Sequence, residues 1–375
     1  MAYASSAAWY PLLNVYLKEH ELSGFEIGIV SSVIPMVMLV GQPFWGLGAD
    51  RWGRRRTLLL TMFLSSVLVT GFVWCEGFWL FLAWNTIFAL LFNPVQPLID
   101  SYALDYVEAH PRSSYGRFRM WGAIGWAVTT PIVGHLTTGR DLGLIFPVAA
   151  VLMLVGWLVG VQSKGRESGR TGLELSWEYV GPVVKNGRLL LFLVLAFMFA
   201  VGTASVWTFY SVYLSEIGAS RQLIGIAFGI QGFSELPFFF FSRAILDRCG
   251  IERTLTFAFL LMAGRVFFYS WTYIPALAVA VDVVHGMTWS LFLVASVEYV
   301  NMLVPPKLRA TGQSLFWAVY FGAGAIIGNT WAGFLYDRMH IHGMFGVNAW
   351  IILTAAILAV TLFNKSHFRV EARKL

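Results

Sequence analysis

Apolar stretches long enough to cross a lipid bilayer recur along the whole 375-residue chain. A transmembrane helix needs about 20 mostly apolar residues, and continuous apolar blocks are unlike the short alternating strands of a membrane barrel. Charged residues make up 12% of the chain, whereas a soluble domain has about 25%. We therefore predict an all-α membrane protein with twelve transmembrane helices. The predicted spans are 1–17, 26–48, 57–75, 78–104, 119–138, 142–162, 189–214, 222–245, 254–273, 275–300, 311–335 and 343–363.

The positive charges are divided unevenly between the two sets of connecting segments. Placing both termini in the cytoplasm assigns 21 of the 26 Lys and Arg residues to the cytoplasmic side, as the positive-inside rule expects. Arg265 lies inside a predicted helix, and the four on the outer side are Lys18, Arg140, Arg221 and Arg338. The net charge of +6 therefore does not require a nucleic-acid partner. Residues 1–17 lack the leader and cleavage site of a signal peptide, so we interpret them as the first span and expect a cytoplasmic lead-in before it.

The chain contains an internal repeat at a displacement of 197 residues. VYLKE at 15–19 corresponds to VYLSE at 212–216, and DRWGRRRTL at 50–58 corresponds to DRCGIERTL at 247–255. Two parallel halves of six helices each are typical of one large transporter architecture, in which the substrate site lies between the halves. We predict an N-terminal bundle at 1–162, a cytoplasmic linker at 163–188, and a C-terminal bundle with a short cytoplasmic tail at 189–375.

The segment GLGADRWGRRRTL, residues 46–58, resembles the signature of the major facilitator superfamily, with Gly48 in place of the usual Leu. The resemblance implies a fold of two pseudo-symmetric six-helix bundles and a transport function by alternating access. It also implies a gating loop at the cytoplasmic face. The gating residues it predicts are Gly46, Asp50, Arg51, Gly53 and Arg54.

Four further segments resemble the branch that holds phenylpropionate permeases, nucleoside symporters and lactose-type permeases. They are NPVQPLID, YGRFRMWGAIGW, SELPFFF and VVHGMTW. This resemblance implies proton-driven symport of a small organic solute, either an aromatic acid, a nucleoside or a saccharide, with the proton as coupling ion and no other cofactor or metal. We expect a monomer with multiple spans in a bacterial inner membrane, the plasma membrane of the cell.

Four ionisable residues interrupt the apolar helices of the second half: Glu235, Arg265, Asp282 and His285. Counted at 1.5 Å per residue from the ends of their helices, Glu235, Arg265 and His285 lie roughly 15–20 Å deep, near the middle of the bilayer. Asp282 shares a helix face with His285 because three residues separate them. Ionisable side chains inside a membrane indicate a functional site by default. The alternative is a purely structural cluster in which Asp282 and Glu235 neutralise Arg265.

The resemblance to lactose-type permeases assigns roles to these residues. Glu235 and Arg265 correspond to substrate-binding positions, and both also belong with Asp282 and His285 to the expected proton-coupling set. One departure matters, because those permeases carry a Glu one turn after the His and this chain has Thr288. Coupling through that carboxylate is excluded, which leaves Glu235 or Asp282 to carry the proton.

In the first half, the same resemblance predicts substrate contacts from Gln96, Asp100, Arg119 and Trp126. The prolines of NPVQP are expected to kink the fourth helix. Asp100 and Arg119 could pair across the fourth and fifth helices, or lie at the cytoplasmic ends outside any cavity. An aromatic acid would use Arg119 or Arg265 as its partner, whereas a sugar or nucleoside would use Trp126 with Asp100 and Glu235.

Other functions are less consistent with the sequence. A proton-antiport exporter is the nearest alternative, but the fifth helix lacks the Gly-Pro pair that many such exporters carry. The chain has no H-E-x-x-H, G-x-S-x-G or G-x-G-D motif of an intramembrane enzyme, so we do not expect an enzyme. A non-transporting sensor would need a soluble domain, and no loop is long enough to form one.

Overall fold

The computed structural model describes residues 1–109, 115–162 and 186–363, and in these residues the regular structure is entirely helical. The first half contains α1 (Ala2–Glu19), α2 (Gly24–Trp52), α3 (Arg54–Leu68), η1 (Val69–Trp74), α4 (Gly77–Phe92), α5 (Val95–Ala109), α6 (Tyr115–Thr137), η2 (Leu142–Leu144) and α7 (Ile145–Gln162). The second half contains α9 (Gly187–Glu216), α10 (Arg221–Cys249), α11 (Ile251–Tyr269), α12 (Pro275–Val281), η4 (Asp282–Val284), α13 (His285–Leu303), η5 (Pro306–Leu308), α14 (Arg309–Trp317), η6 (Ala318–Gly324) and α15 (Ala325–Phe363).

Each of the twelve predicted spans coincides with helix over most of its length. Eight stretches of described helix are long and apolar enough to cross a membrane by length and composition, and the last of them, Thr311–Thr361, contains two predicted spans. These two spans meet at His340, where φ is 58° and the backbone leaves the helical conformation. The remaining three spans correspond to α1, α6 and α11. The prediction of an all-helical protein with twelve transmembrane segments is confirmed.

Two predicted helices are not continuous. The fourth ends at Phe92 and resumes at Val95, so the chain breaks at Asn93 and Pro94 as the proline pattern predicts. The tenth is interrupted by η4, a 3₁₀ turn that begins at Asp282. This second break has no proline or glycine within it and was not predicted.

The internal repeat extends to the helix boundaries. α2 and α10 begin at residues 24 and 221 and end at 52 and 249, which is the same displacement of 197 at both ends. Gly53 and Gly250 follow these helices with φ of 88° and 82°, a conformation that favours glycine. Because one such residue reverses the chain, α3 and α11 start at once after it. The predicted connection between the second and third spans, residues 49–56, is therefore too long, since Gly53 alone lies outside helix.

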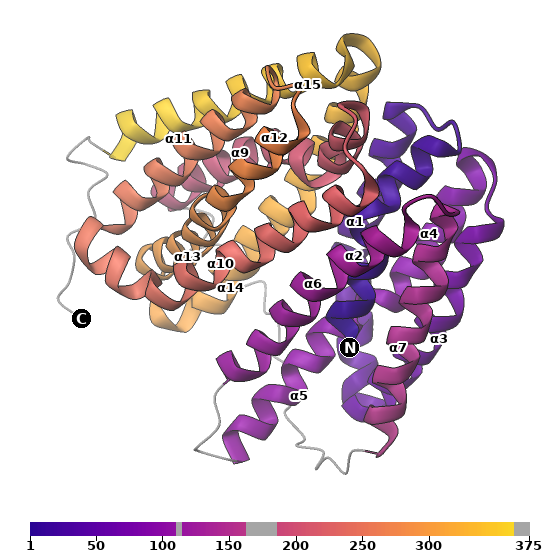
Figure 1. Cartoon of the computed structure of the whole chain (residues 1–375). Helices are drawn as coiled ribbons and strands as arrows, with labels where there is room; N and C mark the ends of the chain where they lie inside the picture. Colours follow the sequence, from indigo (N-terminus) through magenta and orange to yellow (C-terminus); the bar gives the residue numbers. More distant parts are fainter. Residues whose placement is uncertain (110–114, 163–185, 364–375) are drawn as a thin grey trace. The chain divides into compact units, whose positions relative to one another are not determined.

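The described residues form two compact units. One contains those of Met1–Leu173 together with Ser211–Phe233, and the other those of Glu174–Tyr210 with Ser234–Leu375. Within the first unit α1 packs against α6 and α7, and α3 packs against α7 (Figure 1). Within the second, α11 packs against α13 and α15. The predicted division at 1–162, 163–188 and 189–375 stays a prediction.

Candidate functional site

A buried ion pair lies inside the second unit, between α11 and the break after α12. Arg265 Nη2 donates to Asp282 Oδ1 over 2.7 Å, and both side chains are 0% exposed. Two tyrosines complete the surroundings of the carboxylate: Tyr269 Oη donates to Oδ1 over 2.8 Å, and Tyr210 Oη donates to Oδ2. Buried charges persist when they are paired and hydrogen-bonded in this way. Both oxygens of Asp282 are therefore engaged.

The guanidinium of Arg265 also sets the state of His285. Its Nε donates to Tyr269 Oη over 2.7 Å, and its Nη1 lies 2.7 Å from His285 Nδ1. Arginine has only donors, so Nδ1 must be the acceptor. We therefore assign His285 as neutral, with its proton on Nε2.

That proton points toward Glu235 of α10. His285 Nε2 donates to Glu235 Oε1 over 3.2 Å, and the two side chains are 3% and 27% exposed. Exposure thus increases along the chain of contacts, from none at Arg265 and Asp282 to more than a quarter at Glu235. The four ionisable residues form one continuous network whose most accessible member is a carboxylate.

A close approach of α10 and α13 holds His285 beside Glu235. The Gly286 amide donates to Ser234 Oγ over 2.9 Å. A Cβ at Gly286 would overlap the carbonyl oxygen of Ser234, so the position tolerates only glycine. Trp207 from α9 packs against the imidazole at a steep angle, with ring centroids 5.9 Å apart. The contact between Gly286 and Ser234 fixes the start of α13, and Trp207 restrains the imidazole ring itself.

Sequence reasoning identified the four charges but not their supports. The sequence analysis assigned no individual role to the supporting residues Tyr210, Tyr269, Ser234 and Trp207. Tyr269 follows Arg265 by four residues and so lies on the same helix face, a signal that was available. Tyr210 lies 72 residues before Asp282, and nothing in the local pattern relates them.

Of the four substrate-contact residues predicted in the first half, three have side chains that the structure describes. Gln96 Nε2 donates to Asp100 Oδ1 over 3.0 Å along α5. Trp126 of α6 packs near Tyr10 of α1, with ring centroids 6.2 Å apart. The side chain of Arg119 lies outside the described residues, and the Asp100–Arg119 pair stays a prediction.

Among the predicted gating residues, Asp50 lies in the last turn of α2, and its side chain is outside the description. Arg51 is exposed, and Arg54 is half-buried at the start of α3. A Cβ at Gly46 would meet nothing within 4 Å, so packing does not require glycine there. Gly53 is the one position of the set whose backbone does.

A second polar cluster, which the sequence did not predict, joins the ends of four helices in the first unit. Lys18 pairs with Glu216, and Arg221 Nη2 pairs with Glu19 Oε1 over 2.7 Å. Arg221 Nη1 also donates to the carbonyls of Thr137 and Arg140, at 2.9 and 2.6 Å. The charge of Arg221 thereby lies at the C-terminal end of α6, where a helix dipole favours a cation.

Comparison with known proteins identifies the family to which this chain belongs. The profile of the MFS_1 like family matches residues 1–347. The chain belongs to the MFS_1 like family. It is similar to the uncharacterized transporter YwbF of Bacillus subtilis, at 26% identity over 381 residues that cover 100% of this chain and 92% of the relative. It is also similar to the maltose permease of Geobacillus stearothermophilus, at 27% identity over 340 residues, 90% of this chain and 86% of the permease.

The fold agrees with that of a solved relative. The crystal structure of the nucleoside transporter NupG superposes with a TM-score of 0.87, covering 97% of each chain at 17% identity. This MFS_1 like protein is accordingly a multi-pass membrane protein of the major facilitator superfamily and a secondary transporter of small molecules, not an enzyme.

Proposed function

We propose that this transporter imports a neutral hydroxylated solute, a saccharide or a nucleoside, together with a proton by alternating access. The observation that carries the proposal is the state of Arg265. Its three nitrogens donate to Tyr269, His285 and Asp282, and its side chain is 0% exposed. Arg265 is therefore a poor partner for the carboxylate of an aromatic acid.

The group that the network offers to a solute is instead the Glu235 carboxylate, whose side chain is 27% exposed. A carboxylate accepts hydrogen bonds from hydroxyl groups and repels another carboxylate. In the first unit Trp126, a half-buried aromatic residue, supplies a surface on which a sugar or base can stack. Both features support a neutral, hydroxyl-rich solute.

Of the two carboxylates in the network, Glu235 and Asp282, Glu235 is also the better proton carrier. Protonation of Asp282 would leave Arg265 without its counter-ion inside the bundle, which is strongly unfavourable. Protonation of His285 would require its Nδ1 to release the Arg265 donor. Glu235 has neither restriction, and its exposure gives a proton a route to it.

The remaining parts of the proposal concern the setting. We place the protein in a bacterial inner membrane as a monomer with both termini in the cytoplasm. Bacterial relatives and the excess of Lys and Arg in one set of connecting segments support this placement.

A thermal-shift screen of the purified protein tests the substrate class. We expect saccharides or nucleosides to raise Tm and aromatic acids to leave it unchanged. Uptake of the compound found should then be abolished by Arg265→Ala, His285→Ala and Glu235→Gln with membrane insertion intact. Glu76→Gln, at an exposed residue directly before α4, is the matched control and should transport normally. Stabilisation by aromatic acids alone, or normal uptake in all three variants, contradicts the proposal.

A further inference from the structure

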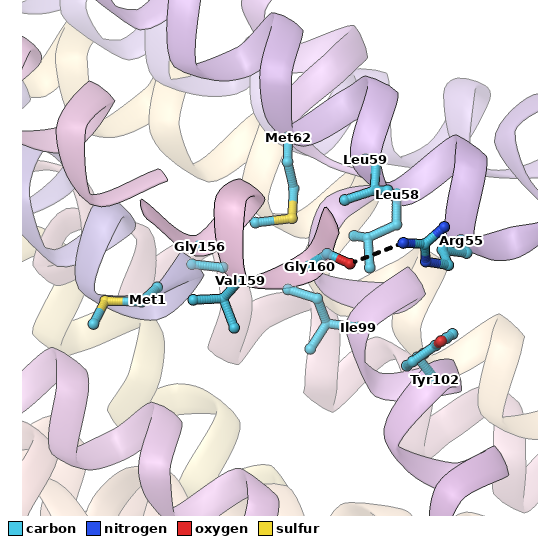
Figure 2. A pocket seen from close by; sticks show the side chains of 11 residues that line it. Met1, Arg55, Leu58, Leu59, Met62, Ile99, Tyr102, Gly156, Val159 and Gly160 are labelled. Atoms are coloured by element: carbon cyan, nitrogen blue, oxygen red, sulfur yellow. Dashed lines mark hydrogen bonds between the residues drawn. The ribbon is translucent and has the colours of Figure 1, made fainter. Parts of the chain in front are cut away.

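A cavity of about 370 Å³ lies within the first unit (Figure 2). It lies where the start of α1 meets α3, α5 and α7. Its volume falls in the range of small-molecule sites, about 300–1,000 Å³. The cavity therefore has room for part of a ligand.

One end of the cavity is polar and incompletely satisfied. Arg55 Nη2 donates to the carbonyls of Val161 and Gly160, at 2.7 and 3.4 Å, and so anchors the guanidinium to the end of α7 (Figure 2). The Nε of Arg55 and the hydroxyl of Tyr102 are buried without a hydrogen-bond partner. Both side chains line the same cavity (Figure 2). Buried polar atoms normally find partners, so these two indicate an absent acceptor.

The other end is apolar. Met1 of α1, Met62 of α3 and Val159 of α7 line it, together with Leu58 and Leu59 (Figure 2). No acidic side chain lines the cavity among the described residues. An occupant that matches both ends has an anionic head and a hydrocarbon tail.

The charges around the cavity indicate where such a molecule comes from. Arg54 and Arg56 flank Arg55, and the positive-inside rule predicts that this end of the bundle faces the cytoplasm. Basic pockets between helices on that side bind the head groups of anionic lipids. We propose that the cavity binds an anionic phospholipid of the cytoplasmic leaflet, with its phosphate at Arg55 and Tyr102 and its acyl chain beside Met62 and Val159.

The test uses the full chain purified in detergent and titrated with phosphatidylglycerol, with phosphatidylcholine as the zwitterionic comparison. We expect phosphatidylglycerol to raise Tm in a saturable way. Arg55→Gln should bind it roughly tenfold more weakly, because one charge-assisted hydrogen bond is lost. Tyr102→Phe should also weaken binding, and Val159→Trp should fill the apolar end and abolish it.

Arg56→Gln is the matched control, because Arg56 is exposed and does not line the cavity. It should bind phosphatidylglycerol like the wild type. Val159→Trp leaves the hydrogen bonds from Arg55 to the carbonyls of Val161 and Gly160 in place. It therefore tests the proposal even if Arg55→Gln fails to fold. Equal stabilisation by phosphatidylcholine, an equal response in Val159→Trp, or an Arg55-dependent response to oleate in place of phosphatidylglycerol would each overturn the proposal.

Discussion

The ion pair between Arg265 and Asp282 leads to a quantitative prediction. Both side chains are 0% exposed, and Asp282 also accepts hydrogen bonds from Tyr210 and Tyr269. Asp282→Asn preserves the shape but removes the charge that neutralises the guanidinium. Leaving one partner of a buried pair uncompensated lowers the free energy of unfolding by about 3–5 kcal/mol. We expect Tm to fall by roughly 5–10 °C.

A double variant separates the charge from the packing. In Arg265→Met/Asp282→Asn neither position is charged, and replacement of a whole buried pair is often neutral for stability. The double variant should therefore recover most of the Tm that the single variant loses. Transport should be absent in the double variant, because His285 no longer receives a hydrogen bond from Arg265 at Nδ1.

Thermal unfolding followed by tryptophan fluorescence measures the stability, and size-exclusion chromatography verifies that each variant is folded. Glu76→Gln serves again as the control, since Glu76 is exposed and exposed charges contribute little to stability. An Asp282→Asn protein as stable as the wild type would contradict the energetic argument. A double variant that transports normally would show that the network is only structural.

Three further variants or measurements probe other parts of the structure. Gly286→Ala should abolish uptake, because its Cβ would overlap a backbone carbonyl of α10, whereas Gly264→Ala, with nothing within 4 Å of its Cβ, should leave uptake normal. Arg221→Gln should lower the free energy of unfolding by about 1–2 kcal/mol, through loss of its bonds to α1 and the end of α6; an unchanged unfolding curve contradicts this. Maleimide at neutral pH should label the exposed Cys249 and spare Cys75, because the Cys75 thiol is buried and the reagent cannot reach it; detection of Cys75 as the first modified residue by mass spectrometry would contradict this.

Much of the fold could be predicted from the sequence because the bilayer imposes simple rules. Apolar length locates the spans, and the repeat of DRWGRRRTL as DRCGIERTL locates Gly53 and Gly250 at equivalent turns. Charged residues in apolar helices are conspicuous, so Glu235 and His285 were found by inspection. These signals are local or periodic.

What could not be predicted depends on contacts between distant segments. The tyrosines around Asp282 resemble the many aromatic residues of a membrane helix, and only their hydroxyl partners distinguish them. The pairing of Arg221 with Glu19 spans 202 residues. The break at η4 has no helix-breaking residue, and it occurs where Asp282 meets Arg265.

Proton movement during transport is the most direct test of the role given to Glu235. The wild type reconstituted in liposomes should alkalinise the external medium when the identified solute is added, in proportion to the solute taken up. Glu235→Gln should produce no alkalinisation, although the solute still raises its Tm. Solute uptake by the wild type without a pH change, or undiminished proton movement in Glu235→Gln, would contradict the proposed mechanism.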